Sequence, residues 1–299
     1  MNTGATTAWN YVKTGLLMAA LTAVLILLGG LIGGSTGIVV MVIVAVAFNF
    51  AMYWGSGTMA LKMSHAVPVD EQYAPELHQM IARLAQRAGV PKPGVYVTPD
   101  AQANAFACGR NPKHSAIAVT QGIQHQLTMR ELEGVLAHEM AHIRNRDILI
   151  ASVAAMAAGA ISAVANWLQF SLFFGGDDEG GLGLIGTLAA VIIAPIAATI
   201  IQLAISRQRE YQADLTGAEL LGDPEPLADA LENLQRGAER MPMQVNPAAA
   251  PMYIVNPLAA LHGRGMSKLF STHPPMEERI RRLRALAPVI AVQAQEATV

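Results

Sequence analysis

Two long blocks of the sequence contain no basic residue, and they constrain the fold more than any other feature. All 20 Lys and Arg lie at position 13, within residues 57–147, or within residues 207–299. The block 14–56 holds two apolar runs joined by a Gly/Ser turn, and the block 148–206 holds two more, joined by GGDDEGG. Each run has about 18–27 residues, and a helix that crosses a bilayer needs about 20. The sequence therefore predicts four transmembrane helices in two hairpins.

The alternatives are apolar helices of a soluble core, or a signal peptide for the first run. A signal peptide explains one run of four, and the second run follows it at once, which disfavours cleavage. Composition supports a membrane protein: 53% of residues are hydrophobic and 14% are charged, against about 25% charged in soluble domains. With a net charge of −2, nothing in the composition suggests a nucleic-acid partner, which would call for a clearly basic stripe. With Cys108 as the lone cysteine, no intrachain disulfide can form.

Basic residues predict the orientation of the spans, because those next to a span stay in the cytoplasm. The residues that flank the predicted spans are Lys13, Lys62, Arg144, Arg146, Arg207 and Arg209. The two tight turns carry no positive charge. Every large polar segment is therefore expected on the cytoplasmic side, together with both termini.

Between the spans, the pattern predicts a small sheet among helices. Expected helices cover residues 75–88, a segment that starts at the capping box TMRE (128–131), 207–221, 226–239 and a segment after Pro275. Expected strands cover residues 94–97, 104–109 and 115–120. The expected fold is thus a mainly α integral membrane protein with an α+β soluble part. Its four regions are an N-terminal hairpin (1–56), a cytoplasmic part with the sheet (57–147), a second hairpin (148–206) and a second cytoplasmic part (207–299).

The stretch GVLAHEMAHIRNRD lies directly before the second apolar block. His138 and His142 are four residues apart, so on a helix both imidazoles project from one face, as two zinc ligands do. Glu139 lies about 100° around the helix from His138 and about 60° from His142. It can therefore reach a metal-bound water without being a ligand, which is what a general base requires. The alternative is an amphipathic helix with two solvated histidines.

A third ligand is offered by the stretch SRQREYQAD after the fourth apolar run. A catalytic zinc keeps three protein ligands and one open position. Glu210 qualifies because its helix starts at the same membrane face as His142. Asp214, one turn further, could accept a hydrogen bond from a ligand histidine and orient it. The alternative is a solvated face that balances Arg207 and Arg209.

Four motifs follow one another along the chain: NAFACG, His-Glu-Met-Ala-His, Arg-Glu-Tyr-Gln-Ala-Asp beyond a hydrophobic hairpin, and STHPP at 271–275. Together they resemble the HtpX family of membrane zinc metalloproteases, over nearly the whole chain. The resemblance implies a zincin-like catalytic domain of the gluzincin type, facing the cytoplasm from the bacterial inner membrane. It also implies a role in stress response and membrane-protein quality control. Endoproteases that trim prenylated CAAX proteins share the superfamily, so fold similarity alone does not separate the substrates.

The resemblance assigns His138, His142 and Glu210 as ligands of one Zn²⁺ per chain. Glu139 becomes the general base of peptide hydrolysis. Cobalt or manganese could replace zinc in vitro. The expected partners are protein substrates, chiefly membrane proteins, and the lipid bilayer; the oligomeric state and the role of the 240–262 loop stay open.

Two further segments resemble functional parts of the family. Asn104, Ala105 and Phe106 resemble its edge strand, where an extended substrate could pair by β-addition; the alternative is an ordinary half-buried strand. His273, in the STHPP motif, could stabilise the oxyanion or shape the cleft. A helix-initiating role for the segment before Pro275 is the alternative.

The alternative to a protease is a membrane scaffold or transporter with a non-catalytic metal site. A structural zinc is closed by four ligands, usually rich in cysteine, and a transporter places ionisable residues inside its spans. This chain offers three N/O ligands and a spare glutamate, and its apolar runs hold no ionisable residue, so the sequence favours the protease.

Some chemistry-bearing residues are not assigned to the site. Cys108 is expected to be a small strand residue, and the basic run 277–286 to be a solvated helix face, with contact to anionic lipid as the alternative. The histidines without ligand spacing are His65, His78, His114, His125 and His262.

Overall fold

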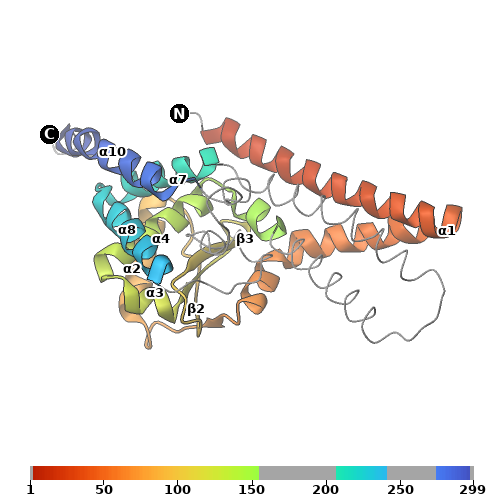
Figure 1. The fold of residues 1–299 in the computed structure, drawn as a ribbon, viewed down its shortest axis with the longest axis horizontal. Helices are drawn as coiled ribbons and strands as arrows, with labels where there is room; N and C mark the ends of the chain where they lie inside the picture. Colours follow the sequence, from red (N-terminus) through yellow and green to blue (C-terminus); the bar gives the residue numbers. More distant parts are fainter. Residues whose placement is uncertain (1–2, 155–206, 241–273, 297–299) are drawn as a thin grey trace.

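The computed structural model describes residues 3–154, 207–240 and 274–296. In this part of the chain the helices are α1 (Thr3–Met63), α2 (Pro75–Ala88), α3 (Gln121–Gln126), α4 (Met129–Arg144), α7 (Arg207–Leu221), α8 (Glu225–Arg240) and α10 (Met276–Glu296). The strands are β1 (Val67–Pro68), β2 (Gly94–Thr98), β3 (Ala105–Asn111) and β4 (His114–Thr120). Figure 1 shows a body of helices packed around a small sheet, from which α1 projects as a long hairpin.

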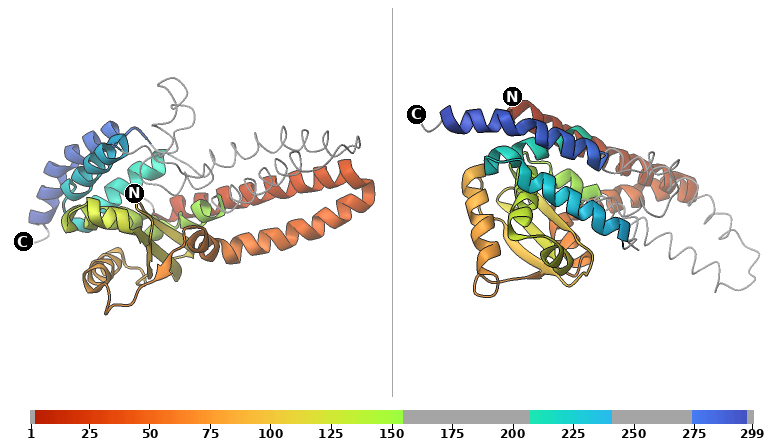
Figure 2. Two further views of the ribbon diagram at one scale, coloured as in Figure 1. Left: turned by 60° about the horizontal axis from the view of Figure 1, so that its bottom comes forward. Right: turned by 60° about the vertical axis from the view of Figure 1, so that its left-hand side comes forward.

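The element α1 consists of two antiparallel helical arms (Figures 1 and 2). The helix is interrupted at Gly33 (φ −131°, ψ 15°) and Gly34 (φ 56°, ψ −139°). Only glycine adopts the second conformation readily, because it has no Cβ. Next to this turn the arms approach so closely that a Cβ on Gly37 would collide with the carbonyl oxygen of Gly29. The predicted Gly/Ser turn between two apolar helices is therefore confirmed.

The apolar character of α1 suits a membrane. Its second arm, Gly33–Met63, is long and apolar enough to cross a bilayer, and its first arm contains a shorter apolar helix, Val12–Leu27. Between the arms, Asn49 Nδ2 donates a hydrogen bond to Thr22 Oγ1 at 2.7 Å. The second predicted hairpin cannot be compared, because residues 155–206 lie outside the described part of the chain.

The sheet is mixed, with the strand order β1-β2-β4-β3. Strands β2 and β4 are parallel, whereas β1 with β2 and β3 with β4 are antiparallel. Strand β3 therefore forms one edge of the sheet, next to α4 and α1. On the outer side of β3 the backbone N–H of Ala107 points toward the helix that carries the predicted metal ligands.

The two faces of the sheet contact different helices, as the two-residue period of a strand dictates. On one face Ala105, Ile117 and Val119 join the main core with α2, α4, α7 and α8. On the other face Phe106 and Cys108 pack against Ala60 and Leu61 near the end of α1, together with Ala116 and Ala118 of β4. This contact is one reason why the second arm of α1 continues past residue 56 to Met63.

Helix α4 lies at the centre of the molecule. It starts at a capping box in which Thr128 and Glu131 bond each other's backbone N–H groups, as the sequence predicts. Helix α7 crosses it closely, since Gly217 lies against the backbone of Ala137 and His138. This close crossing brings the segment around Glu210 to the histidine-bearing face of α4.

Most of the predicted elements of the soluble part are confirmed, with identical bounds for residues 75–88 and 207–221. Strand β1 and helix α3 were not predicted. Both are short, and β1 is a strand only because it pairs with β2. The prediction of a solvated face for the run 277–286 is wrong at Arg279, which is fully buried. His273 and the 240–262 loop lie outside the described residues.

Candidate metal centre

His138 and His142 face each other on adjacent turns of α4. Their Nε2 atoms are 3.2 Å apart, and their ring centroids are 4.7 Å apart. The His138 side chain is 2% exposed and that of His142 is 18% exposed. The one-turn spacing therefore produces two imidazole nitrogens that converge on one point, as the sequence predicts.

Helix α7 adds a carboxylate to this point. Glu210 Oε2 lies 3.6 Å from His138 Nε2, and Glu210 Oε1 lies 3.9 Å from His142 Nε2. In tetrahedral coordination with metal–ligand distances of about 2.1 Å, ligand atoms are separated by about 3.4 Å. The three separations around this point lie close to that value. Among the described residues, these three form the group that could hold a metal ion.

Each histidine is oriented through its other ring nitrogen. His138 Nδ1 lies 3.0 Å from Asp214 Oδ1, and His142 Nδ1 lies 3.1 Å from both carboxylate oxygens of Asp147. A carboxylate can only accept, so each Nδ1 carries a proton in these bonds, and each Nε2 of a neutral ring offers a lone pair. Two lone pairs and a carboxylate that face one another are an arrangement that a cation stabilises. The residues present therefore fit a divalent metal of the kind that binds imidazole and carboxylate.

Asp214 is itself held by a buried arginine. Arg279 donates from Nη2 to Oδ1 at 2.6 Å and from Nε to Oδ2 at 2.9 Å, the bidentate geometry that guanidinium favours. Burial opposes ionisation of Asp214, but the charge and hydrogen bonds of Arg279 outweigh it and lower the pKa of Asp214 to about 2. Asp214 is therefore an anion that accepts from His138.

The electrostatics at His142 favour positive charge at the centre. Burial lowers the pKa of His142, but Asp147, then Glu210 and Glu139, outweigh it and raise this pKa to about 10. The same carboxylates attract a divalent cation. Metal binding requires the unprotonated Nε2, so bound metal and a ring proton compete for one lone pair.

Glu139 lies beside this group without joining it. Its side chain is buried, and its Oε2 accepts a hydrogen bond from the backbone N–H of Ala107 on β3 at 2.8 Å. Burial raises the pKa of Glu139, and the nearby His142 and His138 offset only part of this rise. A carboxylate with a raised pKa, fixed between the histidines and an edge strand, is suited to accept and return a proton.

The predicted substrate strand lies next to Glu139. Ala105 and Phe106 belong to β3, and Asn104 precedes it: its N–H donates to Thr120 Oγ1, and its carbonyl oxygen accepts from the N–H of Thr120. All three side chains are buried, which agrees with an ordinary strand, but the outer edge of β3, where the N–H of Ala107 bonds Glu139, faces the centre. Cys108 is a buried strand residue, as the sequence predicts, and burial raises the pKa of its thiol to about 12.

Two contributing residues were not predicted from the sequence. Asp147 follows the C-cap Asn145 and Arg146, whose positive φ of 57° turns the chain back toward the helix. Arg279 is one turn before the buried Leu283 on α10. A basic residue at an apolar position of an amphipathic helix was the available signal for Arg279.

The chain was compared with known protein families and structures. The model of "Peptidase family M48" matches residues 71–287. A protein named "Protease HtpX homolog" from Pelotomaculum thermopropionicum is 52% identical over 282 residues, which cover 93% of this chain and 99% of that protein. Proteins of the same name from Gemmatimonas aurantiaca and Burkholderia thailandensis are 51% and 50% identical, again over 93% of this chain and 99% and 98% of their own. The crystal structure of S. mikatae Ste24p superposes with a TM-score of 0.48 at 20% identity, covering 82% of this chain and 57% of that one.

Proposed function

Because the chain belongs to peptidase family M48 and is a metalloprotease, we propose that the centre on α4 and α7 binds one zinc ion and cleaves peptide bonds in membrane or misfolded proteins. His138, His142 and Glu210 are the ligands in this proposal, and Glu139 is the general base. The observation that carries it is the convergence of the three ligand atoms within 4.8 Å of one another, with Glu139 held beside them by the backbone of β3.

When bound, the metal supplies Lewis acidity, which makes water more acidic and polarises a peptide carbonyl. The chain's own residues do the rest. Asp214 and Asp147 hold the two histidines with Nε2 directed at the metal. Glu139 takes the proton from the attacking water and returns it to the nitrogen of the leaving amine. Its bond from Ala107 fixes the carboxylate for both transfers.

The edge of β3 gives the substrate a place to bind. In this proposal an extended peptide pairs along the outer edge of the strand segment that includes Asn104, Ala105 and Phe106, as in other β-addition complexes. Since Ala107 N is directed at Glu139, a peptide paired along this edge would run past the general base. Backbone pairing of this kind accepts many sequences, as the removal of misfolded proteins requires.

The proposed membrane arrangement adds a second apolar hairpin to the one that the structure describes. Four spans in two hairpins would place both termini and the catalytic part (57–147 and 207–299) on the cytoplasmic side of the bacterial inner membrane, with the hairpins at 1–56 and 148–206. Basic residues at the span ends support this orientation. His273 remains a predicted cleft residue. The scaffold or transporter alternative is set aside by the family.

Chelation tests the proposal directly. Full-length protein purified in detergent is expected to cleave casein, to lose this activity when a chelator removes the metal, and to regain it with one equivalent of zinc. Metal content measured on the same sample gives the stoichiometry. Activity that persists after complete removal of the metal would contradict the proposal.

A further inference from the structure

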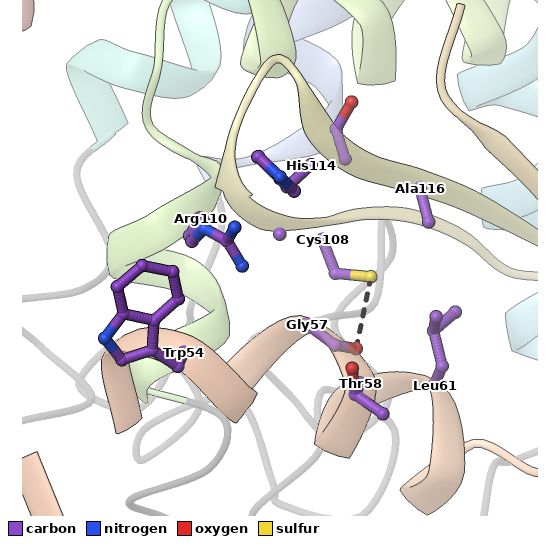
Figure 3. A pocket seen from close by; sticks show the side chains of 10 residues that line it. Trp54, Gly57, Thr58, Leu61, Cys108, Arg110, His114 and Ala116 are labelled. Carbon is purple, nitrogen blue, oxygen red and sulfur yellow. Dashed lines mark hydrogen bonds between the residues drawn. The ribbon is translucent and has the colours of Figure 1, made fainter. Parts of the chain in front are cut away.

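A cavity of about 220 Å³ lies between the second arm of α1 and the β3–β4 hairpin, on the face of the sheet that α1 covers (Figure 3). Trp54 and Thr58 line it from α1, and Arg110 and His114 line it from the hairpin. It contains none of the residues of the metal centre. The proposed proteolytic function gives it no role.

The distance of this cavity from the tip of the α1 hairpin is about the thickness of the hydrocarbon core of a bilayer. From the glycine turn at Gly34, a helix rises 1.5 Å per residue, so Trp54 lies about 30 Å from the tip of the hairpin. This distance equals the thickness of the hydrocarbon core of a bilayer, about 30 Å. If the hairpin spans the membrane, Trp54 lies in the interfacial layer, where tryptophan is enriched. In that arrangement the cavity lies at the level of the lipid headgroups.

The polar side of the cavity is cationic. The Arg110 guanidinium stacks on the Trp54 ring, with Cζ 4.4 Å from the ring centroid. His114 Nδ1 donates to Asn111 Oδ1 at 3.1 Å, which makes Nε2 of the neutral ring an acceptor, so the positive charge that lines the cavity comes from Arg110. Lys113 lies in the same turn. The two segments that build the cavity, residues 3–63 and 101–130, contain no Asp or Glu.

Below the cavity, α1 presents an apolar stripe. Ile43, Val46, Phe50 and Trp54 are three or four residues apart, so they share one face of the helix. All four are at least half exposed in the structure (51–66%). The stripe leads along the helix from the hydrocarbon depth to the Arg110–Trp54 stack. One face of the molecule thus combines an apolar track with a cationic pocket at its end.

We propose that this cavity binds the phosphate of an anionic phospholipid, whose acyl chain lies along the stripe on α1. Arg110 supplies in-plane N–H donors, with its own face covered by Trp54, and this is the geometry that suits a phosphate. Arg110 is on β3, the strand that presents Ala107 to Glu139. A bound lipid therefore ties the strand beside the general base to the membrane surface.

Lipid binding is measured on the full-length, zinc-loaded protein in detergent by native mass spectrometry, with phosphatidylglycerol or phosphatidylcholine added. The wild type is expected to retain phosphatidylglycerol in preference to phosphatidylcholine. Arg110→Gln should weaken the binding of phosphatidylglycerol about fivefold, the effect of one cation near a lipid surface. Arg110→Lys keeps the positive charge but loses the planar fork of donors, so it should weaken binding less than Arg110→Gln does.

The matched control is Arg83→Gln, since Arg83 is exposed on α2 and paired with Glu133; it should bind lipid like the wild type. Equal binding of both lipids by the wild type, or unchanged binding of phosphatidylglycerol in Arg110→Gln, would overturn the proposal. So would displacement of the lipid by millimolar inorganic phosphate, which would make this a site for free phosphate. Because lipid is counted directly, the result does not depend on whether the protein cleaves its substrates.

Discussion

Arg279 on α10 holds Asp214 on α7 with two hydrogen bonds, of 2.6 Å and 2.9 Å, and both side chains are buried. Asp214 in turn lies 3.0 Å from His138 Nδ1. The C-terminal helix thereby sets the orientation of a metal ligand in the centre of the chain. Removing one partner of such a buried pair leaves the other charge without compensation.

Arg279→Met should therefore damage both folding and metal binding. We expect a loss of about 3–5 kcal/mol of stability from the unpaired carboxylate, and zinc affinity lowered about 10- to 100-fold because His138 loses its fixed orientation. Thermal unfolding in detergent and zinc competition with a chromophoric chelator measure the two effects. The exposed Arg281 provides the control, since Arg281→Gln should change neither.

The double variant Arg279→Met with Asp214→Asn separates lost packing from lost charge. An asparagine can still accept from His138 through its amide oxygen, and no unpaired charge remains. The double variant should be more stable than Arg279→Met alone. If the two are equally unstable, the pair does not act through its charge.

Asp147 should act on metal affinity more than on folding. Asp147→Asn keeps an acceptor for His142 Nδ1 but removes the negative charge, so we expect zinc affinity to fall about tenfold. Asp229→Asn, on the exposed side of α8, is the matched control and should bind zinc like the wild type. An Asp147→Asn protein with unchanged zinc affinity would show that Asp147 does not support the ligand.

Two glycines of the core should respond differently to alanine. A Cβ on Gly217 would lie 3.1–3.2 Å from the backbone of Ala137 and His138, which α7 can relieve only by shifting away from α4. Gly217→Ala should therefore lower zinc affinity, because Glu210 moves with α7.

A Cβ on Gly134 would lie 2.5 Å from Leu227 N, so Gly134→Ala should cost about 1–3 kcal/mol of stability and leave the affinity of the folded protein for zinc unchanged. The same zinc competition and unfolding measurements compare the two variants; equal zinc affinities would contradict this difference.

The capping box of α4 should make stability depend on pH. Burial opposes ionisation of Glu131, but hydrogen bonds from the backbone and hydroxyl of Thr128 outweigh it, so the pKa of Glu131 lies below its ordinary 4.5. Stability from this carboxylate is fully present above about pH 4.5 and is lost as pH falls through the lower, folded-state value. Glu131→Gln should cost about 0.5 kcal/mol at pH 7 and less at pH 3. Melting temperatures of metal-free wild type and variant at both pH values test this; a constant difference would contradict it.

Local signals in the sequence predict the soluble elements well. The apolar spacing of α2, closed by Gly89 with φ 67°, and the Thr128 capping box both act within a few residues. The sheet order β1-β2-β4-β3 depends on pairing between distant segments, which a hydrophobic pattern does not encode. The two-residue strand β1 has no pattern of its own.

The site residues that the sequence predicts are those whose arrangement follows from their spacing on a single helix. His138, Glu139 and His142 follow from positions on one helix, and Glu210 and Asp214 from positions on another. Arg279 could not be placed, because its partner Asp214 is on a different helix and the contact arises only when α10 packs on α7. Asp147 reaches His142 only through the reversal at Arg146.

The most direct test of the proposed mechanism is to measure zinc content and proteolysis on the same preparations of wild type and Glu139→Gln. Glutamine has the same shape and can still accept from Ala107, but it cannot take a proton from water. The proposed mechanism predicts one zinc per chain in both proteins, with casein cleavage in the wild type and at least a hundredfold less in the variant, within the range for general base catalysis of about 10²–10⁴. Equal cleavage by both proteins, or loss of zinc from Glu139→Gln, would contradict the assignment of Glu139 as a base that does not bind the metal.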